Sequence, residues 1–336
     1  ISLLKMSVAV VGAGIVGLTT AAHIQDLLPN VKPIFQVTVI ADKFNTETTS
    51  DGAAGLFYPE SNFKGPTPSS AKEWIKYSYK YYEDFLNQDC GVFEISGYVL
   101  STISEDEVKN DLMDGAVPEY RRATRQEMLN YLGNWKYGTF MRSLLIRCRT
   151  FLPWLTERIK SKGGQIINKK IEDLSELKGR YDVVVNCTGL QAKFLCGDDL
   201  IAPLRGQIIK VKAPNIDRFL LTSELSYIIP NCDGLVTLGG TKQLGVWNTS
   251  ISAHDAKGIR SRCNAILPEL ENAPVAWEWA GLRPYRQSVR LEPEIRDGLK
   301  IVHNYGHGAQ GVTAAPGSAR DAAMYVQQLL QVQPKL

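Results

Sequence analysis

Three glycines near the start of the chain have the spacing of a site for the phosphates of a dinucleotide. Gly12, Gly14 and Gly17 form the pattern G-x-G-x-x-G. In this pattern the first glycine permits a tight turn, the second lets backbone approach a diphosphate, and the third lets a helix pack against a strand. Asp42 follows where it could accept hydrogen bonds from ribose hydroxyls. The residues predict a dinucleotide site, at which the bound group carries the chemistry.

A strand, a helix and a second strand are needed to position these residues. Residues 7–11 predict the first strand, an apolar-periodic helix follows the glycines, and residues 36–42 predict a second strand that ends at Asp42. The unpaired N–H groups at the helix start would face the phosphates. The acidic residue usually follows the glycine motif by ~20 residues, and Asp42 lies further along the chain than that. We assign the additional residues to a longer loop at residues 29–33. The alternative is a buried unit whose glycines serve packing alone, and the pattern does not separate FAD from NAD.

Composition predicts an ordinary globular protein. The chain has 336 residues, a net charge of +3 and 44% hydrophobic residues. It contains no dense Lys/Arg block and no apolar run near the ~18–20 residues of a membrane span, so we expect neither nucleic acid nor membrane as a partner. The six cysteines form no C-x-x-C pair, which predicts free thiols and no metal site. We expect no signal peptide, and residues 1–5 to be an extension before a natural start at Met6.

Further apolar segments predict a nucleotide-binding fold assembled from separate parts of the chain. Residues 182–186 are a continuous apolar run, typical of a strand buried on both faces of a parallel sheet. Thr188 and Gly189 follow in a turn whose small side chains would let a cofactor approach. Residues 164–168 and 299–305 predict further strands, and a glycine turn follows the latter.

The intervening stretch has a different pattern. Residues 207–212, 227–230 and 235–238 partly alternate between apolar and polar, which predicts antiparallel strands of a substrate-facing sheet. Aromatic residues at three- and four-residue steps predict a helix whose stripe lies in the core. We predict helices at residues 70–87, at about 139–160 with an interruption near Pro153, and from Pro316 onward.

Eight motifs, spread over nearly the whole chain, resemble those of one family. They lie at residues 10–18, 48–56, 182–189, 205–207, 227–230, 238–241, 281–286 and 303–308. Together they resemble the D-amino-acid oxidase family, which includes D-aspartate oxidase. The resemblance implies an α/β fold in which a Rossmann-like FAD-binding domain is interleaved with an α+β substrate domain on a mixed or antiparallel sheet. We expect the FAD-binding domain at 6–60, 145–200 and 290–330, the substrate domain at 61–144 and 201–289, and a C-terminal tail at 331–336.

The resemblance also implies a reaction. A D-amino acid loses hydride to FAD, the imine hydrolyses to a 2-oxo acid and ammonia, and oxygen is reduced to hydrogen peroxide. The expected partners are therefore a small D-amino acid and molecular oxygen. The final residues Pro334, Lys335 and Leu336 are similar to the peroxisomal Ser-Lys-Leu address. Because the reaction produces peroxide, we expect a peroxisomal protein that meets an import receptor, or otherwise a cytoplasmic one.

The resemblance assigns two catalytic residues. Arg286 is expected to bind the substrate α-carboxylate, since a guanidinium offers parallel donors that match a carboxylate. Tyr227 is the expected second contact, through its phenol. Arg283 is assigned a structural role. A substrate held at its carboxylate would present its α-hydrogen to the flavin without a strong general base, so positioning accounts for most of the catalysis.

Lys242 and Tyr58 are the expected specificity residues. The resemblance places Lys242 where D-aspartate oxidases carry an arginine that meets the side-chain carboxylate, and lysine keeps the charge without the bidentate fork. We therefore favour acidic substrates, D-aspartate and D-glutamate, with neutral D-amino acids as the alternative. Tyr58 replaces a smaller or polar pocket residue of the family, and residues 314–317 depart from its usual bulkier run.

The resemblance also implies a set of FAD contacts. The expected residues are Gly12, Ala13, Gly14, Ile15, Val16, Gly17, Asp42, Lys43, Thr48, Thr49, Ala54, Gly55, Leu56, Ile171, Thr188, Gly189, Gly308, Ala309, Gln310, Gly311, Val312 and Thr313. Two other classes of function stay open at this point: an NAD(P)-dependent dehydrogenase, and an FAD-binding relative without catalytic activity.

Overall fold

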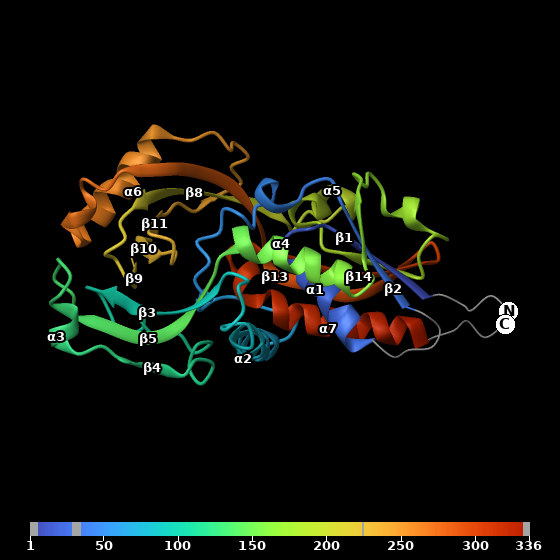
Figure 1. Cartoon of the computed structure of the whole chain (residues 1–336), viewed down its shortest axis with the longest axis horizontal. Coiled ribbons are helices and arrows are strands. Elements are labelled where there is room, and N and C mark those ends of the chain that lie inside the picture. Colours follow the sequence, from blue (N-terminus) through green and yellow to red (C-terminus); the bar gives the residue numbers. More distant parts are fainter. Residues whose placement is uncertain (1–5, 29–34, 224, 332–336) are drawn as a thin grey trace.

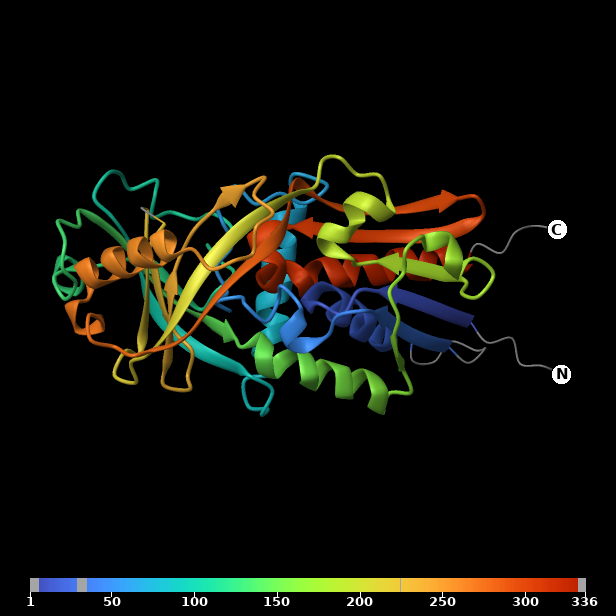
Figure 2. The same cartoon turned by 90° about the horizontal axis from the view of Figure 1, so that it is seen from above.

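One long mixed sheet runs through the molecule in the computed structural model, which describes residues 6–28, 35–223 and 225–331 (Figure 1). The strand order is β4-β5-β3-β9-β10-β11-β8-β13-β14-β7-β1-β2-β6, with β12 paired to β8. The predicted loop at 29–33, the extension at 1–5 and the tripeptide at 334–336 lie outside the described residues. The two halves of the sheet follow each other along the long axis of the molecule (Figure 2).

Five neighbouring strands at one end of the sheet are parallel. They are β1 (Met6–Val11), β2 (Phe35–Ala41), β6 (Gln165–Asn168), β7 (Val183–Asn186) and β14 (Leu299–His307). In chain order their arrangement is 3-2-1-4-5, the order of a Rossmann fold, and it reverses between β1 and β7. These strands lie where the apolar runs predicted them, and the α/β fold class is confirmed.

Four helices cover this parallel end. They are α1 (Ile15–Leu27), α2 (Ser70–Glu83), α4 (Cys148–Ser161) and α7 (Gly311–Gln331). Helix α1 packs against α7 and α4, and α7 packs against α2 and β14 (Figure 1). The aromatic stripe of α2 belongs to the core, as predicted: Trp74 is fully buried, and its Nε1 donates to Asp321 Oδ2 at 2.6 Å. Within the described residues, no helix combines the length and the apolar character that a membrane crossing requires.

The rest of the sheet is antiparallel except for one parallel pair, β3 with β9. Its strands are β3 (Val92–Ser101), β4 (Glu119–Arg122), β5 (Tyr137–Ile146), β8 (Ala202–Lys212), β9 (Arg218–Thr222), β10 (Tyr227–Pro230), β11 (Leu235–Gly239) and β12 (Gln243–Leu244). Three further helices are α3 (Arg125–Met128), α5 (Ala192–Leu195) and α6 (Ala253–Ile266). A second core cluster lies between α6 and the strands of this half.

Strand β13 (Val275–Arg296) joins the two halves. Its first part pairs with β8 and its second part with β14, and the register shifts between Tyr285 and Arg290. The chain therefore changes its pairing partner within one strand, at the boundary between the mainly antiparallel and the parallel part of the sheet.

Two helix predictions were wrong at their starts. The helix predicted from residue 139 begins only at Cys148, because residues 137–146 pair along their whole length with β3 as β5. The last helix begins at Gly311, so Pro316 lies inside it. A proline in a helix removes one N–H donor and frees the carbonyl four residues earlier. Here Tyr82 on α2 donates its hydroxyl to that carbonyl, Val312 O, at 2.8 Å.

Residues 314–317, which lack the bulkier side chains usual in the family, lie where α2 comes close to α7. Gly317 N donates to Ser78 Oγ at 2.9 Å, and a Cβ at Gly317 would overlap the backbone of Trp74. Ala314 and Ala315 are fully buried in the same contact region. Small residues are therefore required where two helices exchange hydrogen bonds at short range.

Candidate functional site

A cavity of about 810 Å³ is lined by residues of both halves of the sheet. It reaches the carboxyl ends of β1 and β7 at Gly12 and Thr188. This is the point at which the strand order reverses, where ligands bind in open α/β sheets. The geometry of the fold therefore places the cavity where the glycine motif predicted a ligand.

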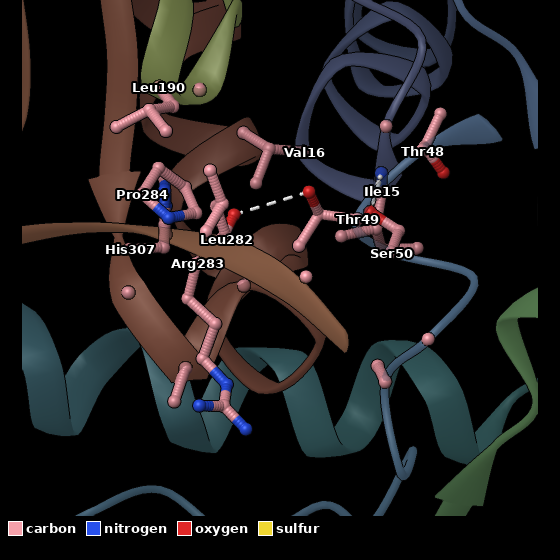
Figure 3. A pocket seen from close by; sticks show the side chains of 18 of the residues that line it. Ile15, Val16, Thr48, Thr49, Ser50, Leu190, Leu282, Arg283, Pro284 and His307 are labelled. Carbon is pink, nitrogen blue, oxygen red and sulfur yellow. Dashed lines mark hydrogen bonds between the residues drawn. The ribbon is translucent and has the colours of Figure 1, made fainter. Parts of the chain in front are cut away.

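The three glycines of the motif act in three different ways. Gly12 has a φ of +110°, and a Cβ there would overlap Cys187 O. A Cβ on Gly17 would overlap Gly12 O, so Gly17 lets α1 pack onto the turn. Gly14 lies at the cavity surface, with only Ser50 Oγ near the place of a side chain, at 3.2 Å. Ser50 Oγ also accepts from Ile15 N at 3.0 Å (Figure 3), which fixes the start of the helix.

Almost all of the predicted cofactor residues line this cavity. Asp42, Lys43 and Ile171 lie at the ends of β2 and β6, and Thr49 donates its hydroxyl to Leu282 O at 3.2 Å (Figure 3). The exception is Gly17, which does not line the cavity because it is packed against the motif turn. The lining residues from the prediction are Gly12, Ala13, Gly14, Ile15, Val16, Asp42, Lys43, Thr48, Thr49, Ala54, Gly55, Leu56, Ile171, Thr188, Gly189, Gly308, Ala309, Gln310, Gly311, Val312 and Thr313.

Tyr227 lines the other end of the cavity. It begins β10 directly opposite Gly239 on β11, and its ring occupies the space that a Cβ of Gly239 or Gly240 would need. Burial raises the pKa of Tyr227, an effect that the hydrogen-bonded Arg283 guanidinium opposes. The phenol therefore keeps its proton at neutral pH and can donate a hydrogen bond.

Arg283, for which a structural role was predicted, also lines this end of the cavity. Its guanidinium lies over Gly206 of β8, where any Cβ would overlap it, and Nη1 donates to Thr241 O at 3.1 Å. In Figure 3 its side chain extends away from Leu282 and Thr49. Arg283 and Tyr227 thus present a guanidinium and a phenol side by side.

Arg286 is not part of this arrangement, and the prediction for its position was wrong. Its Nε donates to Asp198 Oδ2 at 3.1 Å and its Nη1 to Ser288 O at 2.8 Å, and it does not line the cavity. Side chains of a strand alternate between its faces, so residues three apart, such as Arg283 and Arg286, point in opposite directions. The glycine at 206 and this alternation are the signals that could have selected Arg283.

Lys242 and Tyr58, the expected specificity residues, both line the same end of the cavity. Burial raises the pKa of Tyr58 to about 12. Lys242 Nζ lies 2.8 Å from Glu60 Oε1, and Glu60 also lines the cavity. Glu60 was missed, since a single carboxylate in a loop carries no local pattern.

The model of a family described as FAD dependent oxidoreductase matches residues 7–324. The chain belongs to this family. A D-aspartate oxidase from Homo sapiens is 40% identical over 95% of this chain and 94% of its own length. A D-amino acid oxidase from Dugesia ryukyuensis is 35% identical over 97% of this chain and 98% of its own.

A solved structure of glycine oxidase from Bacillus cereus ATCC 14579 has a TM-score of 0.79, at 17% identity. The structural match covers 96% of this chain and 95% of the other and shows a shared fold. The family predicted by resemblance is confirmed, and so is FAD, which its description names. An NAD(P)-dependent dehydrogenase is no longer a candidate.

The residues present fit FAD. The cavity is lined by Asp42, directly after β2, and by Gly14 at the start of α1, where the only atom near an added Cβ is Ser50 Oγ at 3.2 Å. A helix N-terminus with backbone that a phosphate can approach, and a carboxylate after the second strand, suit the diphosphate and a ribose of FAD.

Proposed function

We propose that this protein oxidatively deaminates D-amino acids and favours those with acidic side chains. In this reaction a D-amino acid, oxygen and water give a 2-oxo acid, ammonia and hydrogen peroxide. FAD, when bound, supplies the acceptor for the hydride that leaves the α-carbon. The human D-aspartate oxidase and the flatworm D-amino acid oxidase, similar over nearly their full lengths, support this reaction class.

One observation carries the proposal: Arg283 and Tyr227 meet at the end of the cavity opposite to the adenosine-side residues. A guanidinium binds a carboxylate through two parallel N–H donors, and the phenol adds a third. Held in this way, the α-carboxylate fixes the orientation of the α-hydrogen toward the cofactor. Much of a barrier can be removed by such positioning alone. His303 and His307 are buried with lowered pKa values and are not assigned as bases.

The preference for acidic substrates rests on Lys242. It follows Thr241, whose carbonyl accepts from Arg283, so its ammonium belongs to the same end of the cavity. A cation there can pair with a second carboxylate on the substrate side chain. Lysine gives this charge without the planar fork of arginine.

The test is the Lys242→Leu variant, assayed for peroxide release with D-aspartate and D-alanine. Loss of a charged hydrogen bond should raise the KM for D-aspartate about 10- to 100-fold and change that for D-alanine less than twofold. Lys80→Leu, which removes an exposed lysine from α2, is the matched control. Equal changes for both substrates would instead support the same reaction on neutral D-amino acids.

We also propose a peroxisomal location through Pro334, Lys335 and Leu336. These residues are similar to a receptor-read address, and a peroxide-producing reaction suits that compartment. Deletion of the three residues from a fluorescently tagged chain should move the protein into the cytosol. An unchanged distribution would contradict the proposal.

A further inference from the structure

Glu60 and Lys242 form an ion pair at the substrate end of the cavity. Glu60 Oε1 lies 2.8 Å from Lys242 Nζ, and both residues line the cavity. Glu60 follows Tyr58 and Pro59 in the segment after the first cofactor residues, whereas Lys242 comes from the loop between β11 and β12. The contact therefore exists only because the fold brings the two loops together.

Glu60 differs from the other carboxylates of the cavity. Among the described lining residues these are Asp42, Glu47 and Glu172, all in segments that follow β2 or β6 at the adenosine end. Glu60 lies instead near Tyr58, where its charge adds to the effect of burial in raising the pKa of that phenol. The substrate end thus contains one ammonium and one carboxylate that neutralise each other.

An ion pair of this kind can be exchanged. The side chains of Lys242 and Glu60 are 37% and 36% exposed, and pairs with such exposure contribute little to stability. A substrate carboxylate can therefore displace Glu60 from Lys242, but it must then lie beside a second negative charge. A side-chain amide meets no such cost, because it can accept from Lys242 and donate to Glu60 while the pair stays intact.

We propose that Glu60 is a specificity-determining residue that competes with the substrate side-chain carboxylate for Lys242. The cavity then accepts D-amino acids with side-chain amides, D-asparagine and D-glutamine, alongside the acidic ones. This inference rests on the proposed function, since it concerns the substrates of the same site. It assigns to Glu60 the role of limiting the preference that Lys242 creates.

The experiment compares Glu60→Gln with the unaltered holoenzyme on D-aspartate, D-asparagine and D-alanine. Removal of a like charge should raise kcat/KM for D-aspartate about tenfold, lower that for D-asparagine, and leave that for D-alanine within twofold. Glu94→Gln, which breaks an exposed pair with Arg142 on the sheet at a comparable distance of 2.7 Å, should change none of the three.

A second readout separates this inference from the proposed function. Succinate has two carboxylates and no amino group, so its binding can be followed by the absorbance of the bound flavin without turnover. Tighter succinate binding by Glu60→Gln supports the competition even if no D-amino acid releases peroxide, an outcome that would refute the proposed function alone. Weaker binding of succinate, or equal changes in kcat/KM for D-aspartate and D-alanine, would overturn the role of Glu60.

Discussion

The two ends of the cavity use the chain in different ways. The nucleotide end is organised around β1, α1 and β2, which follow each other along the chain, with further lining residues after β2, β6 and β7. The substrate end is assembled from Tyr58 and Glu60, Tyr227, Lys242 and Arg283, which lie far apart in the sequence. Residues of one continuous unit have a fixed spacing in the sequence, from which their function can be predicted. Residues from separate loops and strands have no such spacing.

Glycine is needed at both ends for opposite reasons. At the nucleotide end, Gly12 and Gly17 let pieces of backbone touch. At the substrate end, Gly206 and Gly239 leave room on the sheet for the guanidinium of Arg283 and for the Tyr227 ring. The first use fixes the shape of the turn, and the second determines which side chains can occupy the cavity.

The largest expected effect belongs to the substrate end. Arg283→Leu should lower kcat/KM for the best D-amino acid about 10³-fold, because a buried carboxylate would lose its charged partner. Arg286→Leu should change kcat/KM less than tenfold but lower the free energy of unfolding by about 1–3 kcal/mol, since it leaves the buried Asp198 with one partner fewer. Steady-state kinetics and denaturant unfolding measure the two effects. If Arg286→Leu were the variant that lost activity, our assignment at this end would be reversed.

The next effect tests the nucleotide end. Gly17→Ala should lower the free energy of unfolding by about 3 kcal/mol and reduce the flavin content of the purified protein, because its Cβ would overlap Gly12 O. Gly258→Ala on α6 is the control, since only the tip of Arg262 lies near its added Cβ, at 3.3 Å. It should be neutral or slightly stabilising. Normal flavin content in Gly17→Ala would show that the turn is more adaptable than its packing indicates.

The smallest effect concerns the acid sensitivity of the nucleotide half. Burial lowers the pKa of His23 on α1 to about 4, while its Nδ1 donates to Thr19 O at 2.8 Å. Above pH 6.5 the imidazole is neutral in both the folded and the unfolded protein. Between pH 6.5 and about 4 the unfolded chain binds a proton that the folded protein does not, so stability falls as the pH falls.

His23→Gln should therefore reduce the loss of stability between pH 7 and pH 5 by about 2 kcal/mol. Chemical unfolding at the two pH values measures this difference. An unchanged pH dependence would show that the acid sensitivity of the protein arises elsewhere.

Most of the parallel sheet could be predicted because its strands are continuous apolar runs. Residues 182–186 and 299–305 were recognised in this way, and both strands are buried between neighbours. Residues 139–146 were misjudged because the largely apolar sequence at 140–146 suits helix and strand equally, and pairing with β3 decided between them. Pro316 was misjudged because Tyr82, from another helix, satisfies the carbonyl that proline leaves free.

The sequence alone determined that a dinucleotide binds after the first strand, and the recurrence of known motifs indicated the reaction class. Both are local properties, since backbone conformation and glycine spacing depend on adjacent residues. Only the tertiary structure decided that Arg283 and not Arg286 faces the cavity, and that Glu60 neutralises Lys242. These facts depend on strand faces and on contacts between distant loops, and such contacts are fixed by the packing of the whole sheet.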